Sequence, residues 1–478
     1  MKLERLIVVC CLFTLIAAPT SWAQVEEIVK LTNLVHELQK QVSEMQKTVN
    51  QQSAKIHDLE NRQPQVQIPA PGVTTAPATP MSDAEFNEKL GTTLGGANKW
   101  LKDLKFGGDL RLRYETFQQT SGSTSETDDR NRFRFRLRYG AEKKFGDQMK
   151  IGFAMASAEA SSGQNVDPSS TNVSFDNLFN FKDIFIEKAF ATYLPAWAKV
   201  GPVSQLDITA GKLVNPFEKG SSELVWDRDV RPEGIYEKAD FKLIDTQDFD
   251  LTGFATAGQF VLDEDASVSD ATGGDAELFA YQAGFTASFA TPYLEKPADL
   301  LAAVSYFSYD DYAQGGNFLI GTTSLARGNT VCVTNVTLCA QDFEILEYYG
   351  ELSVYPYNTP IRPFVDLAQN VVNDALGDED FAWAIGAKVG KAVKKGDWEA
   401  GYSYRWISAN ALPGFNDSDF GTTGHSGKHG NSIKLGYMFT DHIQLNAAAF
   451  FVRNLNSGTA GVIDEEQQRY QLDMSWKF

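Results

Sequence analysis

The sequence predicts an all-β protein: a sixteen-stranded antiparallel transmembrane β-barrel preceded by an N-terminal α-helical coiled coil. From residue 106 onward, segments of about ten residues with alternating apolar and polar side chains recur between turns. The connections between these segments are alternately short and long, as in membrane barrels. Past residue 20, no apolar run approaches the roughly 18–20 residues that a spanning helix needs. Any membrane insertion must therefore use strands.

Residues 1–23 have the organisation of a secretory signal peptide. Two basic residues precede an apolar run over 6–18, and the small residues Ser21 and Ala23 occupy the two positions that a signal peptidase inspects. Cleavage after Ala23 would leave Cys332 and Cys339 as the only cysteines of an exported chain. We expect them to form a disulfide, because exported thiols usually pair. A metal site would need more ligands close by.

Residues 24–62 carry five heptads with a narrow apolar seam, which predicts a coiled coil. Position a holds Ile28, Val35, Val42, Val49 and Ile56, and position d holds Leu31, Leu38, Met45, Gln52 and Leu59. The pattern favours self-association into a homo-oligomer. The alternative is a lone amphipathic helix on the barrel mouth. β-Branched residues at a and Leu at d lean toward dimers, which leaves the order open.

Residues 63–105 form a proline-rich linker followed by a short segment with helical potential over 83–105. The barrel is expected over 106–478. Its strands are predicted at 108–117, 130–141, 147–158, 183–194, 204–213, 234–242, 247–258, 277–289, 299–309, 343–356, 361–371, 380–391, 396–407, 430–440, 443–454 and 467–478.

The clearest strands assign the two faces of the barrel wall. Phe133 and Phe135 alternate with Arg132 and Arg134 in the segment 130–141. A charge on the lipid face would cost roughly 2–4 kcal/mol at mid-depth. The polar set must therefore face the lumen, and we expect a water-filled channel rather than a dry core.

The last strand alternates strictly from Tyr470 to Phe478 and stops on an aromatic residue. It resembles the C-terminal strand of outer-membrane proteins. That resemblance implies that Phe478 is read by the barrel-assembly machinery.

Four segments look like one family: 108–115, 129–140, 210–217 and 224–234. Over roughly residues 105–478 the chain resembles the "putative porin" family of Gram-negative outer membranes. The resemblance implies a channel for passive diffusion of small solutes, surrounded by outer-membrane lipid and lipopolysaccharide. The alternation of short and long connections places both termini, and therefore the coil, in the periplasm. General porins are commonly trimers, so a trimer is the expected oligomer. The resemblance implies no cofactor and names no solute.

Six arginines on the polar faces of the first two strands form a predicted basic ladder along the lumen. They are Arg111, Arg113, Arg132, Arg134, Arg136 and Arg138. Rows of charged side chains along a pore determine its ion selectivity. The ladder therefore favours a weak preference for anions, despite the net charge of −19 of the whole chain. The alternative is that lumenal carboxylates such as Asp109 and Glu115 neutralise it, so that it serves only packing.

The third long loop, 213–233, is the candidate constriction. Its charged residues are Asp227, Arg228, Asp229, Arg231 and Glu233. In general porins the third loop folds inward, and these charges would then face the arginine ladder. The alternative is a solvent-exposed lid.

Other functions have weaker support. No nucleophile elbow, phosphate loop or zinc signature occurs, and His425 and His429 lie in Gly-rich sequence without helical potential. A barrel enzyme would need a catalytic histidine from very few candidates. The coil would suit a tether that binds a periplasmic partner. The acidic net charge disfavours nucleic-acid binding.

Overall fold

The structure is a computed structural model of the whole chain, and it describes residues 103–120, 127–159, 168–264, 275–291, 296–312, 329, 343–372, 379–421, 426–455 and 466–478. The predicted signal peptide, the coiled coil, the linker up to residue 102, Cys332, Cys339 and His425 lie outside these residues. The described part has no α-helix, and none of its helical turns is long and apolar enough to cross a membrane.

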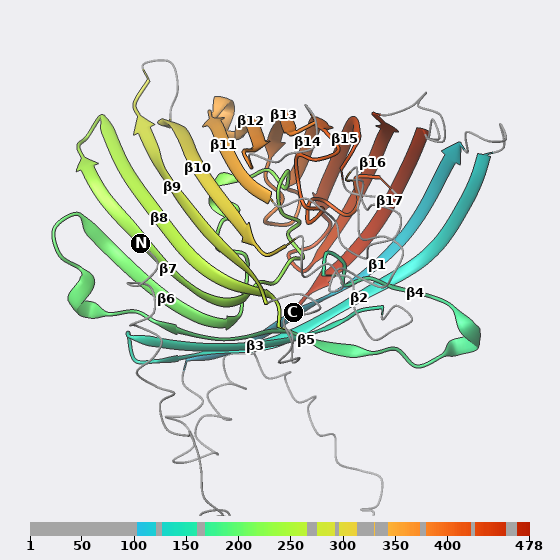
Figure 1. Cartoon of the computed structure of the whole chain (residues 1–478), viewed down its shortest axis with the longest axis horizontal. Coiled ribbons are helices and arrows are strands. Elements are labelled where there is room, and N and C mark those ends of the chain that lie inside the picture. The colour runs from blue at the N-terminus through green and yellow to red at the C-terminus, as the bar shows by residue number, and fades with distance from the viewer. Residues whose placement is uncertain are drawn as a thin grey trace, which may run out of the picture. The chain divides into compact units, whose positions relative to one another are not determined.

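One sheet contains every strand of the described part (Figure 1). The strands are β1 (Leu104–Thr120), β2 (Thr127–Phe145), β3 (Met149–Ser157), β4 (Val173–Ser174), β5 (Ile184–Tyr193), β6 (Val203–Lys212), β7 (Glu233–Asp245), β8 (Phe249–Asp263), β9 (Ala276–Phe289), β10 (Ala298–Asp310), β11 (Phe343–Ser353), β12 (Ile361–Asn370), β13 (Phe381–Gly390), β14 (Trp398–Ile407), β15 (Lys428–Met438), β16 (Ile443–Asn454) and β17 (Glu466–Lys477). Single 3₁₀ turns are η2 (Asn177–Phe179), η3 (Ala196–Ala198), η4 (Glu218–Gly220) and η5 (Pro356–Asn358).

The sheet closes on itself. Each long strand pairs antiparallel with the next long strand along the chain, and β1 pairs with β17. The sixteen-stranded antiparallel barrel is therefore confirmed, since β4 is only a two-residue addition to β2 beyond the end of β3. The predicted strands all appear. Several are longer than expected, most of all β1 and β2.

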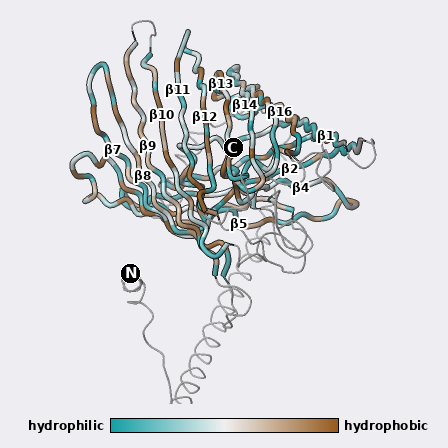
Figure 2. The backbone as a smooth tube through the Cα atoms, turned by 45° about the horizontal axis from the view of Figure 1, so that its top comes forward, coloured by the Kyte–Doolittle hydropathy of each residue, from teal (hydrophilic) through white to brown (hydrophobic). Residues whose placement is uncertain are grey.

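Inward and outward side chains alternate along the wall, as predicted. In β2, Phe133 and Tyr139 are 58% and 44% exposed, whereas Arg134 is 9% exposed. In β14, Trp398 and Tyr402 lie on the outer face. Figure 2 shows hydrophilic and hydrophobic residues interspersed along the same strands. An apolar outer surface of this extent suits lipid, because soluble monomers rarely expose large apolar patches.

Gly108 lies at the seam where the barrel closes. Its backbone exchanges two hydrogen bonds with Phe478, at 2.9 and 3.1 Å. A Cβ atom at Gly108 would lie 2.2 Å from the carbonyl oxygen of Arg138 and 2.9 Å from the Phe478 ring, so the seam leaves room for hydrogen only.

We therefore expect Gly108→Ala to lower the yield of folded barrel, measured as the fraction that migrates as the compact form on an unheated gel. Gly107→Ala is the matched control, because its Cβ would meet only one atom, at 3.4 Å. Equal yields from the two variants would contradict the steric argument.

Candidate functional site: a charged cavity beside two inward loops

The arginine ladder lies on two paired strands. In the register of β1 and β2, Arg111 is opposite Arg136 and Arg113 is opposite Arg134. Like charges directly across an antiparallel pair destabilise it. The pairing of these strands therefore requires carboxylates close to the arginines.

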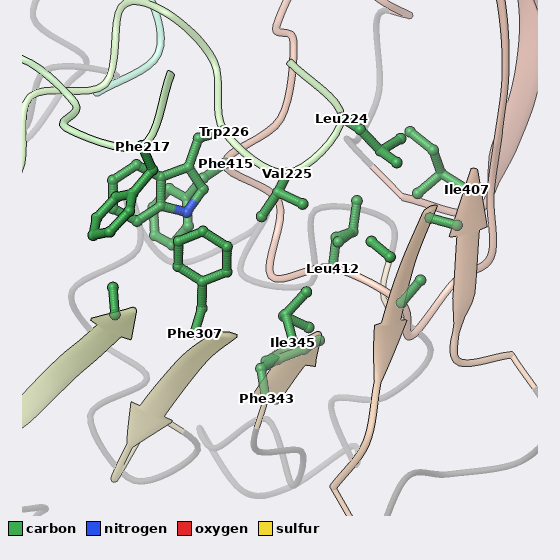
Figure 3. Packing of buried hydrophobic residues seen from close by; sticks show 14 of the residues in the cluster. Phe217, Leu224, Val225, Trp226, Phe307, Phe343, Ile345, Ile407, Leu412 and Phe415 are labelled. Atoms are coloured by element: carbon green, nitrogen blue, oxygen red, sulfur yellow. The ribbon is translucent and has the colours of Figure 1, made fainter. Parts of the chain in front are cut away.

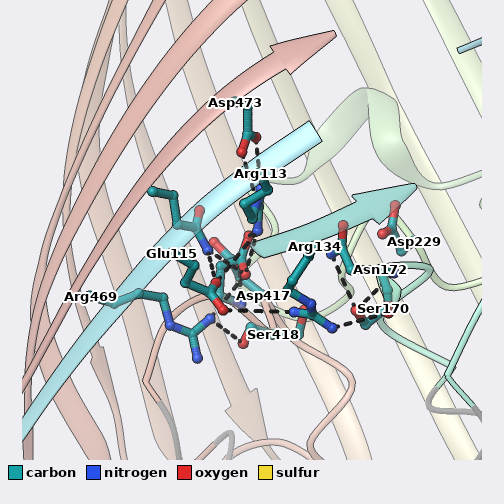
Figure 4. A network of polar contacts seen from close by, with 12 residues as sticks. Arg113, Glu115, Arg134, Ser170, Asn172, Asp229, Asp417, Ser418, Arg469 and Asp473 are labelled. Atoms are coloured by element: carbon teal, nitrogen blue, oxygen red, sulfur yellow. Dashed lines mark hydrogen bonds and ion pairs between the residues drawn. The ribbon is translucent and has the colours of Figure 1, made fainter. Parts of the chain in front are cut away.

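Strand β17 and the loop between β14 and β15 supply part of that counter-charge (Figure 4). We call this loop, 408–427, loop 7. Arg113 donates to both oxygens of Asp473 on β17, at 2.8 and 2.9 Å, which is the two-pronged geometry that guanidinium and carboxylate prefer. It also lies 3.1 Å from Asp419 of loop 7, which accepts a 2.9 Å hydrogen bond from Arg469.

The remaining arginines are paired in the same way. Glu115, fully buried, accepts hydrogen bonds from Arg132 at 2.6 Å and from Gln471 at 2.7 Å. Arg136 donates to Asp109 at 2.7 Å.

All six ladder arginines thus have a carboxylate oxygen at 3.9 Å or less. The geometry favours the neutralised ladder that the sequence left open as an alternative.

The third long connection, 213–232, lies inside the barrel, and we call it loop 3. Phe217 packs edge-on against Phe260 of β8 and Phe307 of β10, with ring centroids 6.2 and 5.4 Å apart (Figure 3). The indole of Trp226 donates a 3.0 Å hydrogen bond to the hydroxyl of Tyr309. These contacts hold one side of loop 3 against the β8–β11 wall.

The inner face of the β8–β11 wall differs from the expectation of a polar lumen. The inward side chains of β8 to β11 include Phe260, Leu278, Phe307, Phe343 and Ile345, all almost fully buried. The lumen is therefore polar along the arginine ladder and largely apolar where loop 3 meets the opposite arc, although Gln282, Ser305 and Glu347 are buried on the same strand faces. The physical reason is that loop 3 covers this part of the wall with its own apolar residues, so a dry core forms where a polar, water-filled lumen was expected.

Polar contacts fasten loop 3 at two further points. The backbone N–H and the hydroxyl of Ser222 both donate to Asp366 of β12, at 2.9 and 2.7 Å. Asp227 joins loop 3 to loop 7, because it accepts a 2.8 Å hydrogen bond from the N–H of Ser418 and donates its own N–H to the carbonyl of Phe415 at 2.6 Å.

The predicted loop charges have different partners. Asp229 pairs with Arg138 at 2.7 Å and is the loop 3 carboxylate that reaches the ladder. Arg228 pairs within the loop with Glu223 at 3.1 Å, and Arg231 pairs with Glu187 of β5 at 2.9 Å. Glu233, the first residue of β7, pairs with Lys212 at the end of β6 at 2.5 Å.

The loop carboxylates differ in pKa because their neighbours differ. Burial and the nearby charges of Asp229 and Asp417 raise the pKa of Asp227 well above its usual range. Burial also opposes ionisation of Asp229 and Asp419, but the guanidinium groups beside them outweigh it, so the pKa of each is lowered. Arg138 acts chiefly on Asp229 and Arg113 on Asp419.

Sequence reasoning missed the part that loop 7 plays. Asp417 pairs with Arg405 of β14 at 2.9 Å and with Lys434 of β15 at 3.3 Å. Leu412 and Phe420 of the same loop are almost fully buried. The sequence contained a signal, since this long loop carries several apolar residues beside an Asp-Ser-Asp-Phe segment at 417–420.

A cavity of about 720 Å³ lies between the two loops and the charged wall. Eleven basic and seven acidic side chains line it, so the basic groups are in surplus. The basic residues are Arg111, Arg113, Arg136, Arg138, Arg228, Arg231, Arg362, Lys388, Lys391, Arg405 and Lys434. In the part of the chain that the structure describes, no group of three or more His, Cys, Asp or Glu side chains is arranged to hold a metal ion.

A family model described as "putative porin" matches residues 118–334. The chain's resemblance to the "putative porin" family is thereby confirmed. The match includes β2 to β10 and loop 3, and so covers the β8–β10 part of the apolar arc and the four ladder arginines of β2.

The chain is also similar to solved porin structures at low identity. A high-pH structure of OprB from Pseudomonas putida is 13% identical, with 80% of this chain and 97% of that chain covered and a TM-score of 0.45. A loop-deletion mutant of OmpT from Vibrio cholerae is 13% identical, with 78% and 99% covered and a TM-score of 0.42. Salmonella typhi OmpF in complex with daunomycin is 10% identical, with 78% and 97% covered and a TM-score of 0.43. A comparison with curated proteins gave no match.

Proposed function

We propose that this protein is an outer-membrane porin, a passive diffusion channel for small polar or charged solutes with a weak preference for anions. The observation that carries the proposal is the cavity between loops 3 and 7 and the charged wall, lined by more basic than acidic groups. Loop 3 acts as the constriction, because it packs against the apolar arc and leaves the space beside the ladder for the solute.

The anion preference follows from local charge. Charges on the wall of a narrow aqueous pore act within a Debye length of about 8 Å at physiological salt. The net charge of −19 is spread over the whole chain. Solutes in the pore therefore respond to the basic surplus of the cavity.

We expect the double substitution Arg111→Gln/Arg136→Gln to move the reversal potential toward cation preference, because it leaves Asp109 and Asp473 less compensated. The measurement is the reversal potential of the reconstituted protein across a planar bilayer under a salt gradient. Lys242→Gln/Arg453→Gln removes the same charge from exposed positions and serves as the control. An unchanged reversal potential in a folded Arg111/Arg136 double variant would contradict the anion preference.

We also propose that residues 1–23 direct export, that the 24–62 coil steadies a homo-oligomer in the periplasm, and that Phe478 marks the chain for barrel assembly. The heptad seam supports the oligomer, since a monomer has no partner helix to bury it. Cys332 and Cys339 would form a disulfide in the fifth long loop.

A further inference from the structure

Two cationic side chains lie side by side on the neighbouring strands β12 and β13 and point into the barrel. Arg362 of β12 is directly opposite Lys388 of β13 in the register of the two strands. Arg362 is on the same face of β12 as Phe364 and Asp366, which are buried inside the barrel. Both cations line the charged cavity.

Their surroundings differ from those of the arginine ladder. Within the described residues, neither Arg362 nor Lys388 has a carboxylate oxygen within ion-pair distance, whereas every ladder arginine has one. Arg362 makes one long hydrogen bond, 3.4 Å, to the carbonyl of Gly390, and its buried Nε–H has no partner. The ammonium of Lys388 lies 5.4 Å from the centre of the Phe364 ring.

The neighbouring carboxylates are engaged elsewhere. Glu351 on β11 accepts a 2.9 Å hydrogen bond from Tyr349. Glu399 on β14 accepts from the side chain of Gln444 at 3.3 Å and from the backbone N–H of Ala392 at 3.5 Å. Glu223 of loop 3 pairs with Arg228 and Lys434. Among the described residues, none of these three carboxylates therefore forms an ion pair with Arg362 or Lys388.

This arrangement is unfavourable without a further group. Like charges directly across two strands repel, and a buried N–H without an acceptor loses its hydrogen bond to water without replacement. The contact of Lys388 with an aromatic face offsets only part of that cost. An anion that enters the cavity would reduce the repulsion between the two cations and would accept a hydrogen bond from the unpaired N–H of Arg362.

We propose that Arg362 and Lys388 form a binding subsite for the carboxylate group of a small organic acid in transit. The guanidinium offers its two-pronged edge to a planar carboxylate, and the ammonium adds a point charge beside it. A volume of about 720 Å³ suits a small organic acid, since ligand sites commonly measure about 300–1,000 Å³. This inference rests on the proposed function, because the solute must reach the lumen.

The test is the block of ion current by an organic acid. The full-length protein is reconstituted in a planar bilayer in potassium chloride at constant ionic strength and pH 7, and citrate is added in steps. We expect citrate to reduce the chloride current in a saturable way, and Arg362→Gln/Lys388→Gln to raise the half-blocking concentration by about tenfold or more.

Two variants serve as controls. Lys388→Arg keeps the charge and should keep the block. Lys242→Gln removes an exposed charge that is paired with Asp245 and should also leave the block unchanged. Each variant is first shown to be folded by its mobility before and after heating.

The outcomes separate the two proposals. A wild-type protein that conducts no ions would overturn the channel function itself. A conducting wild type with the same half-blocking concentration as the double variant would overturn the subsite and leave the channel intact. Block by inorganic phosphate but not by citrate would overturn the assignment to carboxylates.

Discussion

Asp417→Asn is expected to loosen loop 7 and to give a larger, noisier single-channel current. The substitution breaks the buried pair with Arg405 and weakens the contact with Lys434, both at 3.3 Å or less. Removing one partner of a buried ion pair typically costs about 3–5 kcal/mol, because the other charge stays buried and uncompensated. Asp310→Asn, at an exposed position on β10, is the matched control.

The same pair predicts a pH dependence with a definite sign. Burial opposes ionisation of Asp417, but Lys434 and Arg405 outweigh it, so its pKa is lowered. A carboxyl with a lowered pKa stabilises the folded state above its ordinary value of about 4, and that contribution is lost as the pH falls through the lowered pKa. Current noise should therefore rise on acidification below about pH 4 in the wild type. In the Asp417→Asn variant the current noise should already be high at pH 7. A low current noise in that variant would contradict the role of Asp417 in holding loop 7.

Trp226→Ala is expected to release loop 3 from the apolar arc and to increase conductance. The indole is 5% exposed, lies 5.5 Å from the Phe307 ring and donates to Tyr309. Deleting a buried aromatic side chain costs about 3–5 kcal/mol, since the neighbours relax only partly into the space. The measurements are the single-channel conductance and the temperature at which the barrel unfolds.

Trp197→Ala is the matched control, because this tryptophan lies in the η3 turn and is 69% exposed. If the two variants have the same conductance, loop 3 does not set the width of the pore.

The strands could be predicted because their alternation is local. A strand with one lipid face and one polar face shows its period in ten residues, and β2 and β14 do so plainly. In β9 and β10 the same period gave the strand but not the nature of its inner face, since Leu278 and Phe307 point inward while Tyr281 on β9 is also apolar and points outward.

The partners that the ladder has outside β1 and β2 could not be predicted, for a different reason. Arg113 meets Asp473 across 360 positions of sequence and Asp419 across 306. Such contacts depend on the closing register and on how a loop enters the lumen, and neither is encoded in a local period. Asp109 and Glu115 on β1 were named as possible counter-charges, and they pair with Arg136 and Arg132 of the neighbouring strand.

The residues at the seam between β1 and β17 favour the correct pairing register of these two strands when the barrel closes. Until β17 is available, β1 keeps an open edge, which is a template for wrong pairing. Its charged residues also lack part of their partners, because Arg113 and Glu115 meet Asp473 and Gln471 only across that seam. If β1 shifted by one residue relative to β17, Leu112 would face the lumen and the arginines of β1 would face lipid. A slip of two would leave Arg113 buried beside the wrong residue. The charge cluster at the seam thus penalises every ring that closes out of register, in addition to stabilising the one that closes correctly.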